Sequence, residues 1–142
     1  MILNGPGLAD LNGGDAFRQI EAESSALCAE LGFDLELRQS DKPDELVRWI
    51  TADNRQFDAL IINPSASLEA GTVESGALHA AIASMAGTNK PVIEVRLNNI
   101  FRPSIEQAKP LQGPEGQMGF ICGLGLNGYL LGIRAVAERL GS

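Results

Sequence analysis

The sequence predicts an α/β fold in which helices cover both faces of a parallel β-sheet. Short apolar runs alternate with longer segments whose apolar residues recur at helical spacing, the pattern typical of βαβ units. The run from Ala59 to Ile62 is continuously apolar, as expected for a central strand that is covered on both faces. Five such runs and four main helices predict a flavodoxin-like, doubly wound, five-stranded sheet.

Residues that begin or end helices support these boundaries. Asp15 can cap the first helix and Gly32 can end it, while Asp41 with Pro43 can open the second helix. The last helix has an apolar stripe that includes Tyr129. The predicted strands are Met1–Leu3, Asp34–Arg38, Ala59–Ile62, Pro91–Val95 and Gln117–Cys122, and the third helix is expected from about Val73 to Met85.

Composition limits the functions that suit this chain. We expect one domain over residues 1–142, and the net charge of −7 argues against a nucleic-acid or anionic-membrane partner. Two cysteines without metal-type spacing and a single histidine argue against a zinc site, so no metal and no cofactor is expected. The sequence has no charged leader and no apolar stretch of ~20 residues, which makes the cytoplasm the expected location.

Four predicted strand ends are followed by small or polar residues, and we expect the functional site there. In an open α/β sheet, ligands lie outside the carboxyl ends of the strands. The predicted topology has its switch point between the first and third strands, where Asn4 and Asn63 are expected to meet. The four segments are Leu3–Pro6, Arg38–Ser40, Ile61–Pro64 and Val92–Asn99.

The fourth strand carries a candidate anion-binding group. Glu94 and Arg96 are two residues apart and therefore face the same side of the strand. An arginine at the carboxyl end of a strand, followed by Asn98 and Asn99, suits a carboxylate or a phosphate. The alternative is that Glu94 and Arg96 form an ion pair that only closes the edge of the sheet.

The loop after the third strand offers polar groups to the same site. Asn63 and Ser67 can hold a substrate hydroxyl or a water, although such residues also simply make turns. Glu69 can carry a proton if it is desolvated, because burial raises the pKa of a carboxyl group, and otherwise it is a solvated acid. Arg102 either adds a second positive group or lies in solvent.

Two local patterns are interpreted as structural. The stretch Gly123–Gly128 matches a dinucleotide-binding fingerprint, but only helix-type sequence follows it, with no second strand to carry a ribose-binding acid. We therefore predict a tight turn that lets the last helix pack closely on the sheet. His79 falls within the third helix among small and apolar residues and is interpreted as structural or surface-exposed.

The order and spacing of these segments resemble the type II dehydroquinase (3-dehydroquinate dehydratase) family from Leu3 to about Leu140. In that family a lid tyrosine abstracts a proton next to a ketone, an asparagine positions a water, and a histidine protonates the departing hydroxyl. Backbone groups in the segment that matches Leu97 to Asn99 hold the substrate carboxylate. The resemblance also implies a trimer, which in that family often builds a dodecamer. The most specific stretches are Leu3–Pro6, Leu27–Gly32, Arg38–Ser40 and Glu94–Leu97.

Several of the family's catalytic groups have no counterpart in this sequence. Asn63 and Glu94 are retained, but the loop histidine has become Glu69 and the catalytic histidine has become Arg96. An arginine cannot donate a proton near pH 7. The expected lid has shrunk to about residues 12–15, with no tyrosine and no arginine.

Three hypotheses are consistent with the sequence. The first is an enzyme with altered chemistry, in which Glu69 is the base, Arg96 anchors or stabilises an anion, and Asn63 assists. The second is a non-catalytic protein that binds a small carboxylate, and the third is a genuine 3-dehydroquinate dehydratase with replaced catalytic groups. In each case the expected substrate-binding residues are Asn4, Ser67, Glu94, Leu97, Asn98, Asn99 and Arg102.

Overall fold

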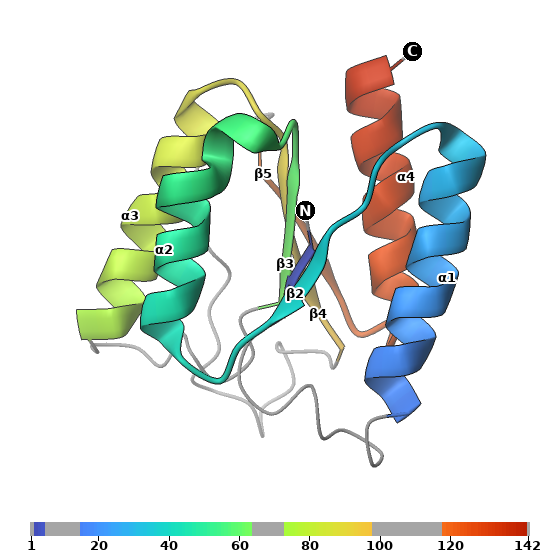
Figure 1. Cartoon of the computed structure of the whole chain (residues 1–142), viewed down its shortest axis with the longest axis horizontal. Helices are drawn as coiled ribbons and strands as arrows, with labels where there is room; N and C mark the ends of the chain where they lie inside the picture. The colour runs from blue at the N-terminus through green and yellow to red at the C-terminus, as the bar shows by residue number, and fades with distance from the viewer. Residues whose placement is uncertain (1, 5–14, 64–72, 98–117, 142) are drawn as a thin grey trace.

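The computed structural model of the protein describes residues 2–4, 15–63, 73–97 and 118–141. Strands and helices alternate along these residues, apart from the succession of the last two strands (Figure 1). The elements are β1 (Ile2–Asn4), α1 (Asp15–Leu31), β2 (Leu37–Gln39), α2 (Pro43–Asp53), the 3-10 turn η2 (Asn54–Gln56), β3 (Leu60–Asn63), α3 (Val73–Gly87), β4 (Val92–Arg96), β5 (Met118–Cys122) and α4 (Asn127–Gly141).

The strands form one sheet in the order β2-β1-β3-β4-β5, and every neighbouring pair is parallel. Figure 1 shows α2 and α3 on one face of this sheet and α1 and α4 on the other. The predicted α/β fold, a parallel sheet with packed helices, is therefore confirmed.

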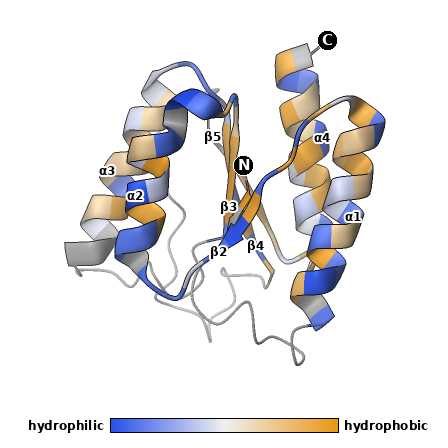
Figure 2. Cartoon of the chain, in the orientation of Figure 1, coloured by the Kyte–Doolittle hydropathy of each residue, from blue (hydrophilic) through white to orange (hydrophobic). Residues whose placement is uncertain are grey.

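Each face of the sheet has its own apolar core. Side chains alternate between the faces along a strand, so Leu60 and Ile62 pack towards α2 and α3, while Ile61 packs towards α1 and α4. Burial on both faces explains why β3 is apolar throughout. In Figure 2 the central strands are coloured as hydrophobic, whereas the helices carry both hydrophobic and hydrophilic colours.

The bounds of the strands differ from the sequence prediction by at most one residue, except at the start of the second strand. The second strand begins at Leu37 rather than Asp34, because among the described residues β2 pairs with β1 alone and the register joins Leu37 to Ile2. The first strand continues to Asn4, which pairs with Gln39 on one side and Asn63 on the other. Residues 34–36 therefore lie outside the ladder, at the amino edge of the sheet. Among the described residues, no helix is long and apolar enough to cross a membrane.

Candidate functional site at the carboxyl edge of the sheet

Several predicted site residues lie at the carboxyl edge of the sheet. Asn4, Asn63 and Arg96 are each the last residue of their strand. The register pairs Asn4 with Asn63 and Ile62 with Glu94, so the ends of β1, β3 and β4 stand side by side. In open α/β sheets, ligands bind outside the carboxyl ends of the strands.

Glu94 and Arg96 form a buried ion pair at the end of β4. Arg96 Nε donates to Glu94 Oε1 over 3.0 Å, and the two side chains are only 9% and 1% exposed. Both residues face the same side of the sheet as Val92, which belongs to the core under α2 and α3. The predicted same-face placement therefore produces a direct contact. Removing one partner would leave the other charge buried without this ion pair, which is costly.

Asn63 is held by a residue that the sequence did not single out. Its side-chain Nδ2 donates to the hydroxyl of Tyr129 over 2.9 Å, and both residues are buried. Burial raises the pKa of Tyr129 well above its ordinary range, and the hydrogen bond from Asn63 opposes that shift only in part. The phenol is therefore neutral at physiological pH and unsuited to act as a base.

The edge thus has two separate polar pairs. Asn63 points towards α4, where Tyr129 lies, whereas Glu94 and Arg96 point towards α2 and α3. A ligand that touches both Asn63 and Arg96 must lie across the end of the sheet rather than against one face.

The glycine-rich stretch after β5 closes this edge and is a structural turn. Gly123 and Gly125 have φ values of 82° and 60°, which favour glycine. Their N–H groups donate to the carbonyl oxygens of Arg96 over 3.2 Å and Leu97 over 3.0 Å. These two bonds fix the backbone directly after β4.

The start of α4 lies very close to the sheet. A Cβ atom on Gly128 would lie 2.9 Å from Val95 Cγ1, which is too close for two carbon atoms. The predicted tight turn with a closely packed helix is confirmed.

The structure describes only some of the other predicted site residues. Leu97 is described and half-buried. His79 is half-buried in α3, and the side chain of Asn4 lies outside what the structure describes. Ser67, Glu69, Asn98, Asn99 and Arg102 all lie outside the described residues. Within the described part of the chain, no group of three or more histidine, cysteine or acidic side chains could hold a metal ion.

The sequence contains Tyr129, but nothing in the sequence indicates that this residue contacts Asn63. It is the chain's only tyrosine, and it lies 66 residues from Asn63. The contact depends on how closely α4 approaches β3, which the glycines of the turn indicate only indirectly.

Comparison with known proteins supports the resemblance over most of the chain. The profile of the family "Dehydroquinase class II" matches residues 1–137. The 3-dehydroquinate dehydratase of Chelativorans sp. is 36% identical over 146 aligned residues, which cover 98% of this chain and 96% of that protein. The corresponding enzyme of Geotalea daltonii is 34% identical and covers 99% of this chain and 96% of its own.

Solved structures agree with this assignment. The type II dehydroquinase from Propionibacterium acnes superposes with a TM-score of 0.77 at 28% identity, over 96% of each chain. A 3-dehydroquinate dehydratase-like protein from Bifidobacterium longum superposes with a TM-score of 0.72 at 28% identity, over 99% of this chain and 96% of that one. This chain therefore belongs to the class II dehydroquinase family.

Proposed function

We propose that this chain is a divergent member of its family whose altered site binds or transforms a small carboxylate. By analogy with the family's substrate, we propose that this carboxylate is cyclic. Arg96 would hold the carboxylate or stabilise a developing anion, Asn63 would contact a hydroxyl or a water, and Glu69 would carry the proton. The observation that carries this proposal is the buried Glu94–Arg96 pair at the carboxyl edge of the sheet. The strand order 2-1-3-4-5 supports the flavodoxin-like, doubly wound topology on which this placement rests.

The chemistry of Arg96 favours binding of an anion over proton donation. A guanidinium has five N–H donors and stays charged, so one arginine can serve a protein carboxylate and a ligand carboxylate together. Glu94 fixes Nε over 3.0 Å and thereby sets the plane of the guanidinium. A low-dielectric surrounding strengthens a charge-assisted hydrogen bond to the ligand.

The family's ordinary dehydratase activity needs a general base and a general acid, and this chain does not carry them at the matching positions. The only tyrosine is buried and bonded to Asn63, and the only histidine lies in α3. A general base and a general acid each typically contribute 10²–10⁴-fold to a rate. Without them, we expect 3-dehydroquinate to be converted slowly or not at all. The alternative to an enzyme with altered chemistry is a binding or regulatory protein that catalyses no reaction.

A genuine 3-dehydroquinate dehydratase is the second candidate function. It is favoured by the 36% identity over 98% of the chain to a relative that bears that name. In this case the missing groups would come from residues outside the described ranges or from a neighbouring subunit.

We propose a single domain, a cytoplasmic location and a trimer or larger assembly, as expected for the family.

One assay separates these functions. The ultraviolet signal of 3-dehydroshikimate should be followed as it forms from 3-dehydroquinate, beside an authentic type II enzyme. Little or no turnover, together with small carboxylates that raise the melting temperature, would support the proposal. Turnover at the rate of the authentic enzyme would overturn it in favour of the second candidate.

The role of Arg96 needs a variant that does not leave the buried charge of Glu94 without Arg96 beside it. The double variant Glu94→Gln/Arg96→Gln removes both charges together. It should abolish the carboxylate-induced rise in melting temperature, whereas Glu21→Gln/Glu23→Gln on exposed α1 should leave it intact. An unchanged rise in the first double variant would exclude Arg96 as the anchor.

A further inference from the structure

A cavity opens at the amino edge of the sheet, at the opposite end from Asn63 and Arg96. Its volume is about 420 Å³, which is within the range of small-molecule sites. The apolar part of its wall includes Ile61 of β3 and Ile133 and Val136 of α4. It is distinct from the carboxyl edge, and the proposed function makes no use of it.

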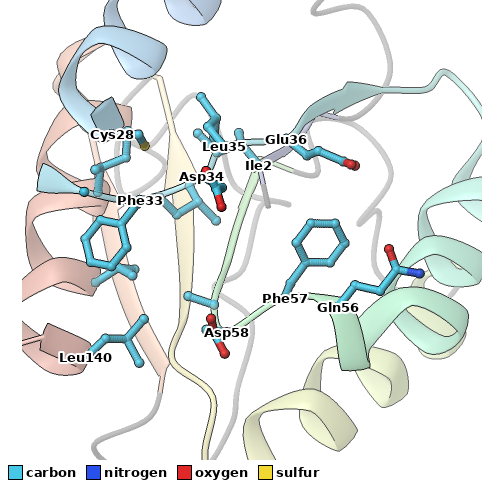
Figure 3. A pocket seen from close by; sticks show the side chains of 15 residues that line it. Ile2, Cys28, Phe33, Asp34, Leu35, Glu36, Gln56, Phe57, Asp58 and Leu140 are labelled. Atoms are coloured by element: carbon cyan, nitrogen blue, oxygen red, sulfur yellow. The ribbon is translucent and has the colours of Figure 1, made fainter. Parts of the chain in front are cut away.

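Two aromatic rings flank this cavity. Phe33 follows α1 and Phe57 precedes β3, and both are half-buried. Figure 3 shows the two rings on opposite sides of the cavity. A flat apolar group that enters between them would cover aromatic surface that is now partly exposed.

Among the described residues, the charged side chains that line the cavity are acidic. Two positive groups lie near them: Arg38, 5.4 Å from the ring of Phe57, and the amino terminus, whose charge opposes the rise in the pKa of Cys28 that burial causes. Asp34, Glu36 and Asp58 line the cavity, and within the part of the chain that the structure describes no lysine, arginine or histidine is a lining residue. Arg38 Nη2 binds Glu36 over 2.6 Å, and Figure 3 shows the Glu36 side chain on the same side of the cavity as Phe57, away from Phe33. Asp34 and Asp58 lie between the two rings in that view and have no ion-pair partner among the described residues.

Two helices end beside the same cavity. α1 ends at Leu31 and α4 at Gly141, and the cavity is lined by Gly32, which follows α1, and by Leu140 in the last turn of α4. The carboxyl end of a helix carries a partial negative charge and favours a cation nearby. The helix ends therefore add to the negative potential of the two aspartates.

We propose that this cavity is a second ligand site, which binds a small organic cation with a flat apolar body. The apolar body lies between Phe33 and Phe57, and the cationic head lies at the mouth beside Asp34 and Asp58. An amine, amidine or guanidine head meets this requirement, because each donates hydrogen bonds to carboxylates and is charged at neutral pH. A carboxylate ligand is repelled here, so the two edges of the sheet select ligands of opposite charge.

Benzamidinium is the probe that tests the proposal, with benzamide and benzoate as neutral and anionic molecules of similar shape. We expect saturable binding of benzamidinium to the full chain by calorimetry, with resonances of Phe33, Phe57 and Ile133 shifting in NMR spectra. Benzamide should bind roughly tenfold more weakly or worse, which corresponds to a loss of about 1.4 kcal/mol or more. Benzoate should not bind at this cavity.

The double variant Asp34→Asn/Asp58→Asn isolates the charge requirement. Both side chains are exposed, so we expect the variant to fold and its affinity for benzamidinium to fall to that of benzamide. Glu21→Gln/Glu23→Gln changes the net charge equally on α1 and should bind benzamidinium like the wild type. Equal affinity for benzamidinium and benzamide, unchanged binding by the aspartate variant, or no saturable binding would each overturn the proposal.

Discussion

The two edges of the sheet use charge in opposite ways. At the carboxyl edge, Glu94 and Arg96 are buried and bonded to one another, and Asn63 is bonded to Tyr129. At the amino edge, the acidic groups beside the cavity are exposed. Buried charges are costly and must be paired, whereas exposed carboxylates keep most of their hydration. We therefore expect substitutions of the charged residues at the carboxyl edge to lower both function and stability. Substitutions of the exposed acidic residues at the amino edge should have little effect on folding.

The largest expected effect comes from breaking one ion pair at each edge and comparing the losses in stability. Arg96→Leu leaves the buried charge of Glu94 without this ion pair, and we expect the free energy of unfolding to fall by about 3–5 kcal/mol. Glu36→Gln breaks the half-exposed pair with Arg38 and should cost less than about 1 kcal/mol. Urea unfolding of both variants measures the difference. Equal losses would mean that the two edges do not differ in the way described.

The close approach of α4 to the sheet gives the next largest effect. In Gly128→Ala the new methyl carbon would lie 2.9 Å from Val95 Cγ1, so the helix must shift, at a cost of about 1–3 kcal/mol. Gly76→Ala in α3 is the matched control, because a Cβ there would meet nothing within 4 Å. That control should be neutral or stabilising by up to ~1 kcal/mol, since alanine favours a helix. Thermal unfolding of the pair distinguishes steric contact from helix propensity.

The sequence predicted the framework of the fold better than its contacts. Apolar runs and capping residues located the helices and strands, because these signals are local. The same-face placement of Glu94 and Arg96 followed from the two-residue period of a strand, and the structure shows the ion pair that was one of the two interpretations. By contrast, the Asn63–Tyr129 bond joins residues 66 apart and depends on the depth at which α4 packs. The cavity was not predicted at all, because its lining comes from the ends of elements that are distant in the sequence.

The buried phenol of Tyr129 predicts a specific pH dependence. Its pKa is raised in the folded protein, whereas in the unfolded chain it titrates near 10. Above about pH 10, the unfolded state therefore binds fewer protons at this group, and stability falls by up to about 1.4 kcal/mol per pH unit from it alone. Below about pH 10 this contribution is constant. Urea unfolding across the alkaline range should show the fall in the wild type and a smaller one in Tyr129→Phe.

Because the chain has a single tyrosine, the absorbance of tyrosinate reports this one group directly. The folded protein should titrate at a higher pH than the urea-unfolded protein. Titration at the same pH in both states would show that the phenol is not buried against Asn63. At neutral pH, Tyr129→Phe should cost about 1–2 kcal/mol, because it leaves the buried Asn63 amide without this partner.

The smallest effect is expected at Arg38, which links the amino edge to α2. Its guanidinium binds Glu36 and Asp53 and lies 5.5 Å from the ring of Trp49 and 5.4 Å from that of Phe57. Arg38→Met keeps the apolar stem but removes the charge, so we expect a loss of about 1 kcal/mol or less, weaker in high salt. A double-mutant cycle with Asp53→Asn measures the pair itself. A coupling above about 3 kcal/mol would show that this pair behaves like the buried pair at the carboxyl edge, and the contrast between the two edges would then fail.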